Sequence, residues 1–99
     1  MSDKLMLILN VPPGLQENLV DWLLEDNRTG FTSSMVFGHS SNIKNYNLTE
    51  QVTGRQKRVE FQVISEGDGI DSLLKALREE FHGTGVHYWI VPVIDEGRL

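Results

Sequence analysis

A strand followed by an amphipathic helix is encoded by residues 58–83, RVEFQVISEGDGIDSLLKALREEFHG. Apolar and polar side chains alternate over residues 59–63, which is typical of a strand with one buried face and one wetter face. The glycines of Gly67-Asp68-Gly69 end this strand. From Ile70 to Phe81 the apolar residues recur on a single helical stripe, and this spacing predicts a helix that packs on a sheet.

Both ends of this helix carry capping signals. Asp68 or Asp71 can accept hydrogen bonds from the first free backbone amides of the helix. Gly83 can adopt the left-handed backbone conformation that closes a helix. The helix is therefore expected to start at one of these aspartates and to stop before the glycine.

The first part of the chain has a similar pattern. Residues 5–11 are apolar at nearly every position and predict a central strand, which Pro12-Pro13-Gly14 ends. A helical stripe follows from Leu15 to Leu23. Residues 31–37, rich in aromatic residues, Ser and Thr, predict a second strand.

The last strand is predicted over residues 86–94, which gives the order strand, helix, strand, strand, helix, strand. This order is that of an α+β, ferredoxin-like βαββαβ sandwich with a four-stranded antiparallel sheet. Right-handed crossovers put both helices on the same face. We expect a single domain over residues 1–99, with a long, polar, mobile loop at about residues 38–56.

The sheet face away from the helices is expected to be apolar as well. Met6 and Ile8 alternate with leucines in the first strand, and Trp89 and Val91 alternate with Tyr88 and Ile90 in the last. A chain of 99 residues has no further element to cover these side chains. The pattern therefore predicts a homo-oligomer in which another copy of the chain covers this face.

Composition excludes several kinds of partner and site. The chain has 14 acidic and 9 basic residues, a net charge of -5 and no cysteine. This charge opposes binding to nucleic acid, and the cluster of Arg55, Lys57 and Arg58 is interpreted as a solvated sheet edge. The apolar run at residues 5–9 is too short to span a membrane, so a cytoplasmic protein without membrane insertion is expected.

Few residues suggest chemistry. The three histidines, His39, His82 and His87, lack the spacing that lets two imidazoles of one helix hold a metal ion. The small residues of Gly83-Thr84-Gly85 would let backbone amides approach a phosphate, although this signal alone is weak and a helix stop followed by a tight turn is the favoured explanation. No group of residues resembles a nucleophile elbow or a converging acid pair, so no enzyme activity is expected.

Two longer stretches resemble the PII signalling proteins and their PII-like relatives: residues 30–38, GFTSSMVFG, and residues 88–93, YWIVPV. Residues 37–41, FGHSS, together with residues 50–55, EQVTGR, are similar to an uncharacterised bacterial branch of that superfamily. CutA, the divalent-ion tolerance protein, is a more distant relative with the same fold. The resemblance covers nearly the whole chain.

The resemblance implies a homotrimer with its three sheets facing inward and a small effector, such as an adenine nucleotide, between subunits. It also implies that the loop regulates a partner protein, for example a metal-efflux transporter or its regulator. A histidine, His87, stands where the family keeps a phosphate-binding lysine. The effector-binding positions implied by this resemblance are Thr32, Gly38, His39, Thr84, Gly85, His87 and Arg98, and those implied for the partner are Tyr46, Glu50, Gln51, Gly54 and Arg55.

Two alternatives remain open at this point. A CutA-like metal-sensing or heavy-metal tolerance protein would bind divalent ions through His39 or His87 and nearby carboxylates. A purely structural interaction module would bind neither nucleotide nor metal. Calorimetry with both kinds of ligand separates these alternatives.

Overall fold

The structure is a computed structural model that describes residues 3–26, 30–39 and 55–99. Its helices and strands follow the predicted order. They are β1 (Lys4–Val11), a 3-10 turn (Pro13–Leu15), α1 (Gln16–Asp26), β2 (Phe31–Gly38), β3 (Gln56–Glu66), α3 (Gly67–Phe81) and β4 (His87–Pro92).

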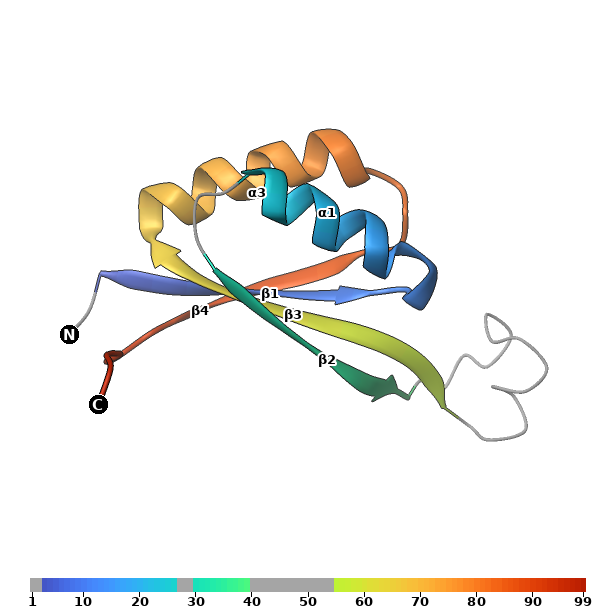
Figure 1. Cartoon of the computed structure of the whole chain (residues 1–99), viewed down its shortest axis with the longest axis horizontal. Coiled ribbons are helices and arrows are strands. Elements are labelled where there is room, and N and C mark those ends of the chain that lie inside the picture. Colours follow the sequence, from blue (N-terminus) through green and yellow to red (C-terminus); the bar gives the residue numbers. More distant parts are fainter. Residues whose placement is uncertain (1–2, 27–29, 40–54) are drawn as a thin grey trace.

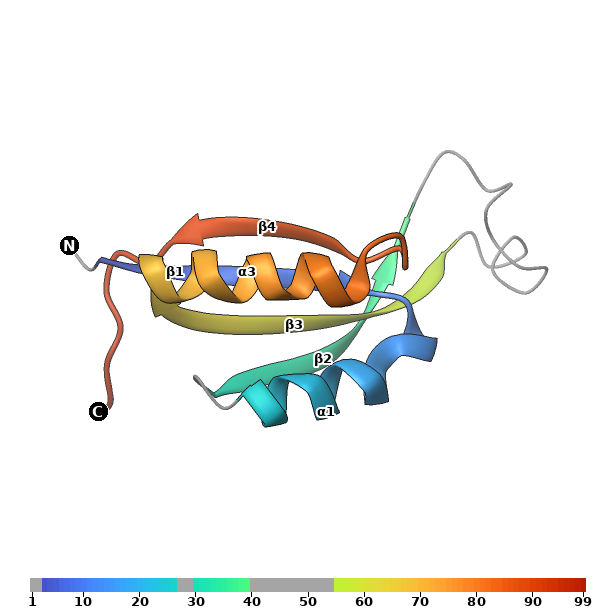
Figure 2. The same cartoon turned by 90° about the horizontal axis from the view of Figure 1, so that it is seen from above.

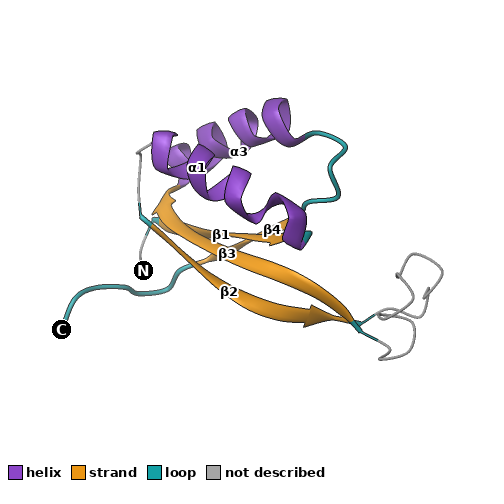
Figure 3. Ribbon diagram, turned by 45° about the vertical axis from the view of Figure 1, so that its right-hand side comes forward, coloured by secondary structure: helices purple, strands orange, loops and turns teal. Residues whose placement is uncertain are grey.

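The four strands form one antiparallel sheet in the order β2-β3-β1-β4. Both helices lie on the same face of this sheet, so the molecule has two layers (Figure 1; Figure 3). The predicted α+β, ferredoxin-like fold is confirmed. Its two central strands are β3 and β1, and the edges are β2 and β4.

The core lies between the sheet and the two helices. Phe61 is the largest of its fully buried side chains. The alternation of apolar residues in β1 and β3 supplies the sheet side, and the apolar stripes of α1 and α3 supply the helix side. The buried cluster consists of Leu7, Leu9, Val11, Leu19, Leu23, Val59, Phe61, Val63, Ile70, Leu73, Leu74 and Leu77.

The start of α3 differs from the prediction. The helix begins at Gly67, directly after β3, and Glu66 is its N-cap without a side-chain hydrogen bond. Asp68 lies inside the first turn, where its charge is favourable for the helix dipole, rather than at the cap. A Cβ on Gly69 would lie 2.7 Å from Ser65 Oγ, so a larger residue here would require the Ser65 hydroxyl to rotate away. Gly83 has φ of 73°, as expected for a left-handed closing residue.

The interpretation of the basic cluster as a sheet edge is wrong. β3, which carries Lys57 and Arg58, lies between β2 and β1. Arg58 is partly buried and hydrogen-bonded to other elements. The error arose because strand order is a tertiary property that a local pattern of charges does not report.

The expected loop at residues 38–56 connects β2 to β3, and residues 40–54 of it lie outside the described residues. Within the residues that the structure describes, no helix is long and apolar enough to cross a membrane.

Candidate functional site

The face of the sheet opposite the helices, called the open face below, is covered by no described element (Figure 3). Its residues alternate along each strand with the core residues. They are Thr32, Ser34 and Val36 on β2, Arg58, Glu60, Gln62 and Ile64 on β3, Met6, Ile8 and Asn10 on β1, and His87, Trp89 and Val91 on β4.

One part of the open face is apolar. The strand register places Ile64, Met6 and Val91 in one cross-strand row and Ile8 beside Trp89 in the next. Trp89 remains 43% exposed and Ile64 37% exposed. The prediction that the first and last strands would show apolar side chains on both faces is therefore correct, and these five residues define the apolar band of the open face.

The adjoining part of the open face is polar. Ser34, Glu60, Asn10 and His87 form one cross-strand row that runs over all four strands. Arg58 projects into this region and donates through Nε to Asn10 Oδ1 at 2.6 Å and through Nη2 to Asn10 O at 3.1 Å. Charge-assisted hydrogen bonds of this kind fix a side chain more firmly than neutral ones.

The Arg58 side chain also connects two of the glycines predicted as effector-binding positions. Its Nη2 donates to Gly85 O at 2.9 Å. A Cβ built on Gly38 would meet Arg58 Cγ at 3.5 Å. Three of the predicted positions, Gly38, Gly85 and His87, are thus gathered at one end of the open face by a residue that the sequence analysis had assigned to a solvated edge.

The turn before β4 has a structural explanation. Thr84 Oγ1 donates to Phe81 O at 2.6 Å, so its hydroxyl satisfies a carbonyl at the end of α3. Gly85 has φ of 87°, and a Cβ there would lie 3.4 Å from Pro12 Cγ. Of the two explanations of this tripeptide, the helix stop and tight turn is what the structure contains.

Two other predicted effector positions lie elsewhere. Thr32 is on the open face of edge strand β2, next to Gln62. Arg98 is exposed in the C-terminal segment, which leaves the far end of β4 (Figure 2). A hydrogen bond from Val93 N to Lys4 O and the ion pair of Lys4 with Glu96 hold this segment beside the start of β1. Within one chain, Arg98 and Gly85 therefore lie at opposite ends of the sheet.

The two histidines suggested as metal ligands are also separated. His87 lies in the row of Ser34, and His39 lies beyond the end of β2 on the far side of the sheet. Strand spacing and rise per residue put them on the order of 20 Å apart, too far for one ion. Among the described residues, no group of three His, Asp or Glu side chains could hold a metal ion.

Most of the residues expected to contact a partner cannot be placed. Tyr46, Glu50, Gln51 and Gly54 lie outside the described residues. Arg55, just before β3, has its guanidinium carbon 4.2 Å from the centroid of the Phe37 ring. This cation–π contact joins the two ends of the connection between β2 and β3.

The sequence analysis did not identify Asn10 and Arg58 as site residues. A signal existed, because Asn10 is the one polar side chain within an otherwise apolar run at residues 5–11. A polar residue in a central strand calls for a hydrogen-bond partner. The identity of that partner could not be derived without the register of β1 with β3.

The fold is that of an α+β, ferredoxin-like sandwich with one uncovered sheet face. The chain belongs to a family described as "Protein of unknown function (DUF3240)", whose sequence pattern matches residues 1–99. None of the curated proteins compared with the sequence matches it.

Three solved structures share this fold. A DUF3240 family protein from Shewanella baltica superposes with a TM-score of 0.80 at 24% identity, covering 100% of this chain and 99% of that one. A protein from Thermus thermophilus, described as a PII-like signalling protein, superposes with a TM-score of 0.62 at 16% identity, covering 89% of this chain and 84% of that one. A functionally unknown protein from Pediococcus pentosaceus superposes with a TM-score of 0.66 at 12% identity, covering 97% of each chain. The resemblance to PII-like proteins is thereby confirmed at the level of the fold.

Proposed function

We propose that this protein is a PII-like regulatory protein that works as a homotrimer, binds a small effector between subunits and controls a partner protein through residues 39–56. The observation that carries the proposal is the apolar band of the open face, with Trp89 and Ile64 both partly exposed. Large apolar side chains gathered on one uncovered face are typical of an interface. Covering the band with other copies of the sheet removes this area from water.

Assembly through the open face would also complete an effector site. Gly38, Arg58, Gly85 and His87 lie at one end of that face, where a second copy would form the other wall. Arg98, at the opposite end of its own sheet, could then act only on a neighbour's site. An adenine nucleotide is the effector that the family resemblance supports, and the expected action is binding rather than catalysis.

Sedimentation equilibrium tests the assembly. The wild-type protein is expected to sediment as a trimer, and Ile64→Glu is expected to sediment as a monomer because it puts charges into the buried band. Leu24→Glu is the matched control, since Leu24 is 61% exposed on α1, on the other side of the molecule. Circular dichroism should show that both variants remain folded. A wild-type protein that stays monomeric at all concentrations would refute the proposal.

Calorimetry with AMP, ADP and ATP, and separately with Zn²⁺, Cu²⁺ and Ni²⁺, tests the effector. His87→Ala is expected to weaken nucleotide binding by about tenfold, while His82→Ala, on the helix side, leaves it unchanged. Heat from a metal ion that disappears in His39→Ala or His87→Ala, with no response to nucleotide, would instead support the metal-sensing alternative. Silence from every ligand would leave an interaction module without an effector.

The partner is the least constrained part of the proposal. The family resemblance supports a metal-efflux transporter or its regulator. Replacing Tyr46 and Glu50 with Ala is expected to abolish co-purification with a co-expressed efflux transporter, while the trimer and nucleotide binding persist. Loss of the trimer in the same variant would contradict the assigned role of this segment.

A further inference from the structure

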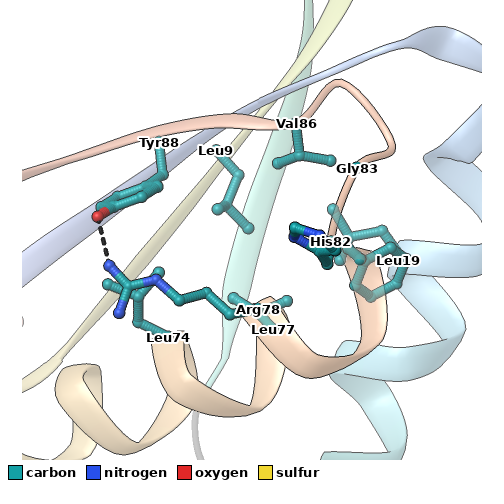
Figure 4. Close-up of a pocket in the computed structure, with 10 residues that line it drawn as sticks. Leu9, Leu19, Leu74, Leu77, Arg78, His82, Gly83, Val86 and Tyr88 are labelled. Atoms are coloured by element: carbon teal, nitrogen blue, oxygen red, sulfur yellow. Dashed lines mark hydrogen bonds between the residues drawn. The ribbon is translucent and has the colours of Figure 1, made fainter.

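A small cleft of about 190 Å³ lies on the helix side of the sheet, away from the open face (Figure 4). It lies between the second half of α3, the start of β4 and α1. Leu9, Leu19 and Leu77 in its wall are buried core residues, and Phe81 and Val86 add to the apolar lining. The cleft therefore offers a preformed apolar site that does not depend on assembly.

Two polar side chains at the rim of this cleft, those of Arg78 and Tyr88, can donate hydrogen bonds. Arg78 Nη2 donates to the hydroxyl oxygen of Tyr88 at 2.6 Å, and the two side chains converge over the cleft (Figure 4). The guanidinium carbon is 5.5 Å from the Tyr88 ring centroid. A guanidinium has five N–H groups, and a phenol that accepts a hydrogen bond still has its own proton to donate.

Arg78 has no carboxylate partner among residues 3–26, 30–39 and 55–99. The ion pair found there is that of Lys4 with Glu96, and Arg78 bonds to Tyr88. Among these residues the cation has no counter-ion, although the chain has a net charge of -5. A rim made of unused donors and one positive charge is complementary to an anionic acceptor, and planar carboxylates fit a guanidinium in two-pronged geometry.

We propose that the cleft binds a small monocarboxylic acid with a short branched-chain or aromatic body. The apolar body lies against Leu9, Leu19 and Leu77, and the carboxylate accepts hydrogen bonds from Arg78 and from the Tyr88 hydroxyl. The volume of the cleft limits the size of the ligand. Because an apolar cavity of roughly 150 Å³ holds a benzene molecule, a phenyl or branched four-carbon group fits and a nucleotide does not.

Chemical-shift titration of the full chain by NMR tests the proposal, with 3-methylbutanoate and phenylacetate as probes and their neutral amides as matched ligands. The backbone amides of Gly83 and Val86 are expected to shift with a dissociation constant of about 1 mM or tighter for the acids. The neutral amides should bind at least about tenfold more weakly, because they lack the charge that Arg78 recognises.

Variants distinguish specific recognition of the carboxylate from nonspecific apolar binding. Arg78→Gln is expected to weaken binding of the acids by about tenfold or more and to leave the amides unchanged. The affinity of Arg78→Lys for the acids should lie between those of the wild type and Arg78→Gln. Tyr88→Phe should bind the acids a few-fold more weakly than the wild type. Lys75→Gln, which removes another exposed cation of α3 outside the cleft, is the control and should change nothing.

Several results would overturn the proposal: no shift at the cleft with either acid, equal binding of acids and amides, or wild-type affinity in Arg78→Gln. A fourth such result is a change in the NMR chemical shifts of Ile94 or Leu99, together with those of Gly83, as the concentration of the ligand-free protein is raised. That result would assign the cleft to the C-terminal segment of a second copy.

Discussion

Arg58, in β3, donates a hydrogen bond through Nη2 to the carbonyl oxygen of Gly85, with 2.9 Å between the two atoms. The same side chain reaches Asn10 on β1 through two further hydrogen bonds. One residue thus ties the inner strands to the turn that precedes edge strand β4. The candidate effector site is held in place by this contact.

Removing this side chain should destabilise the fold. Arg58→Ala loses hydrogen bonds from a charged donor to Asn10 and Gly85, so we expect the free energy of unfolding to fall by about 2 kcal/mol. Lys57→Ala, at the adjacent exposed position of the same strand, should change it by less than about 0.5 kcal/mol. Urea denaturation at one fixed protein concentration measures both, and equal values for the two variants would contradict the structural role of Arg58.

The glycines of the turn after α3 should differ in their tolerance of alanine. Gly83 has φ of 73° and no atom near the position of a Cβ. We expect Gly83→Ala to lower the free energy of unfolding by about 1 kcal/mol, from backbone strain alone. Gly85→Ala should cost at least as much, because its φ of 87° is also left-handed and its Cβ would be in close contact with Pro12 Cγ at 3.4 Å. Gly14, which has open space and lies in a 3-10 turn, should accept alanine without loss. Thermal denaturation that ranks these three variants in another order would refute this reasoning.

The two tryptophans should report on different surfaces. Trp22 packs edge-to-face on Phe81, with ring centroids 6.0 Å apart, between the helices. Trp89 lies on the open face. In Trp22→Phe, we expect acrylamide quenching of the remaining Trp89 to increase as the protein is diluted below its assembly concentration. In Trp89→Phe, quenching of Trp22 should not depend on concentration, and a dependence there would place the interface on the helices.

The pKa of Lys4 is raised, chiefly by its hydrogen bond to Glu96 and also by the attraction of that carboxylate. Because the folded-state pKa exceeds the ordinary value of 10.5, this ion pair stabilises the folded chain below that pH and is lost as the pH rises through the raised value. In an NMR titration, Glu96→Gln should lower the midpoint of Lys4, whereas Glu79→Gln on α3 should leave it unchanged. A midpoint insensitive to Glu96→Gln would mean that the C-terminal segment is not held at β1.

Local patterns were sufficient for the helices, the strands and their order. The alternation at residues 59–63 and the stripe from Ile70 to Phe81 depend on spacings of a few residues, which the sequence contains directly. The predicted end of β3 at Gly67 is correct, because the strand stops at Glu66. The start of α3 was placed wrongly, at Asp68 or Asp71, because the helix follows the strand directly and the glycines lie in its first turn instead of in a connecting segment.

The sequence by itself determined the fold class and the presence of apolar side chains on both faces of the sheet. Both follow from the spacing of apolar residues and from the chain length, which can be read without knowing which segments pack together. Only the tertiary structure decided that β3 is an inner strand, that Arg58 meets Asn10 from 48 residues away, and that Arg78 and Tyr88 form the rim of a cleft. These relationships depend on strand register and helix placement, which arise when distant segments pack against one another.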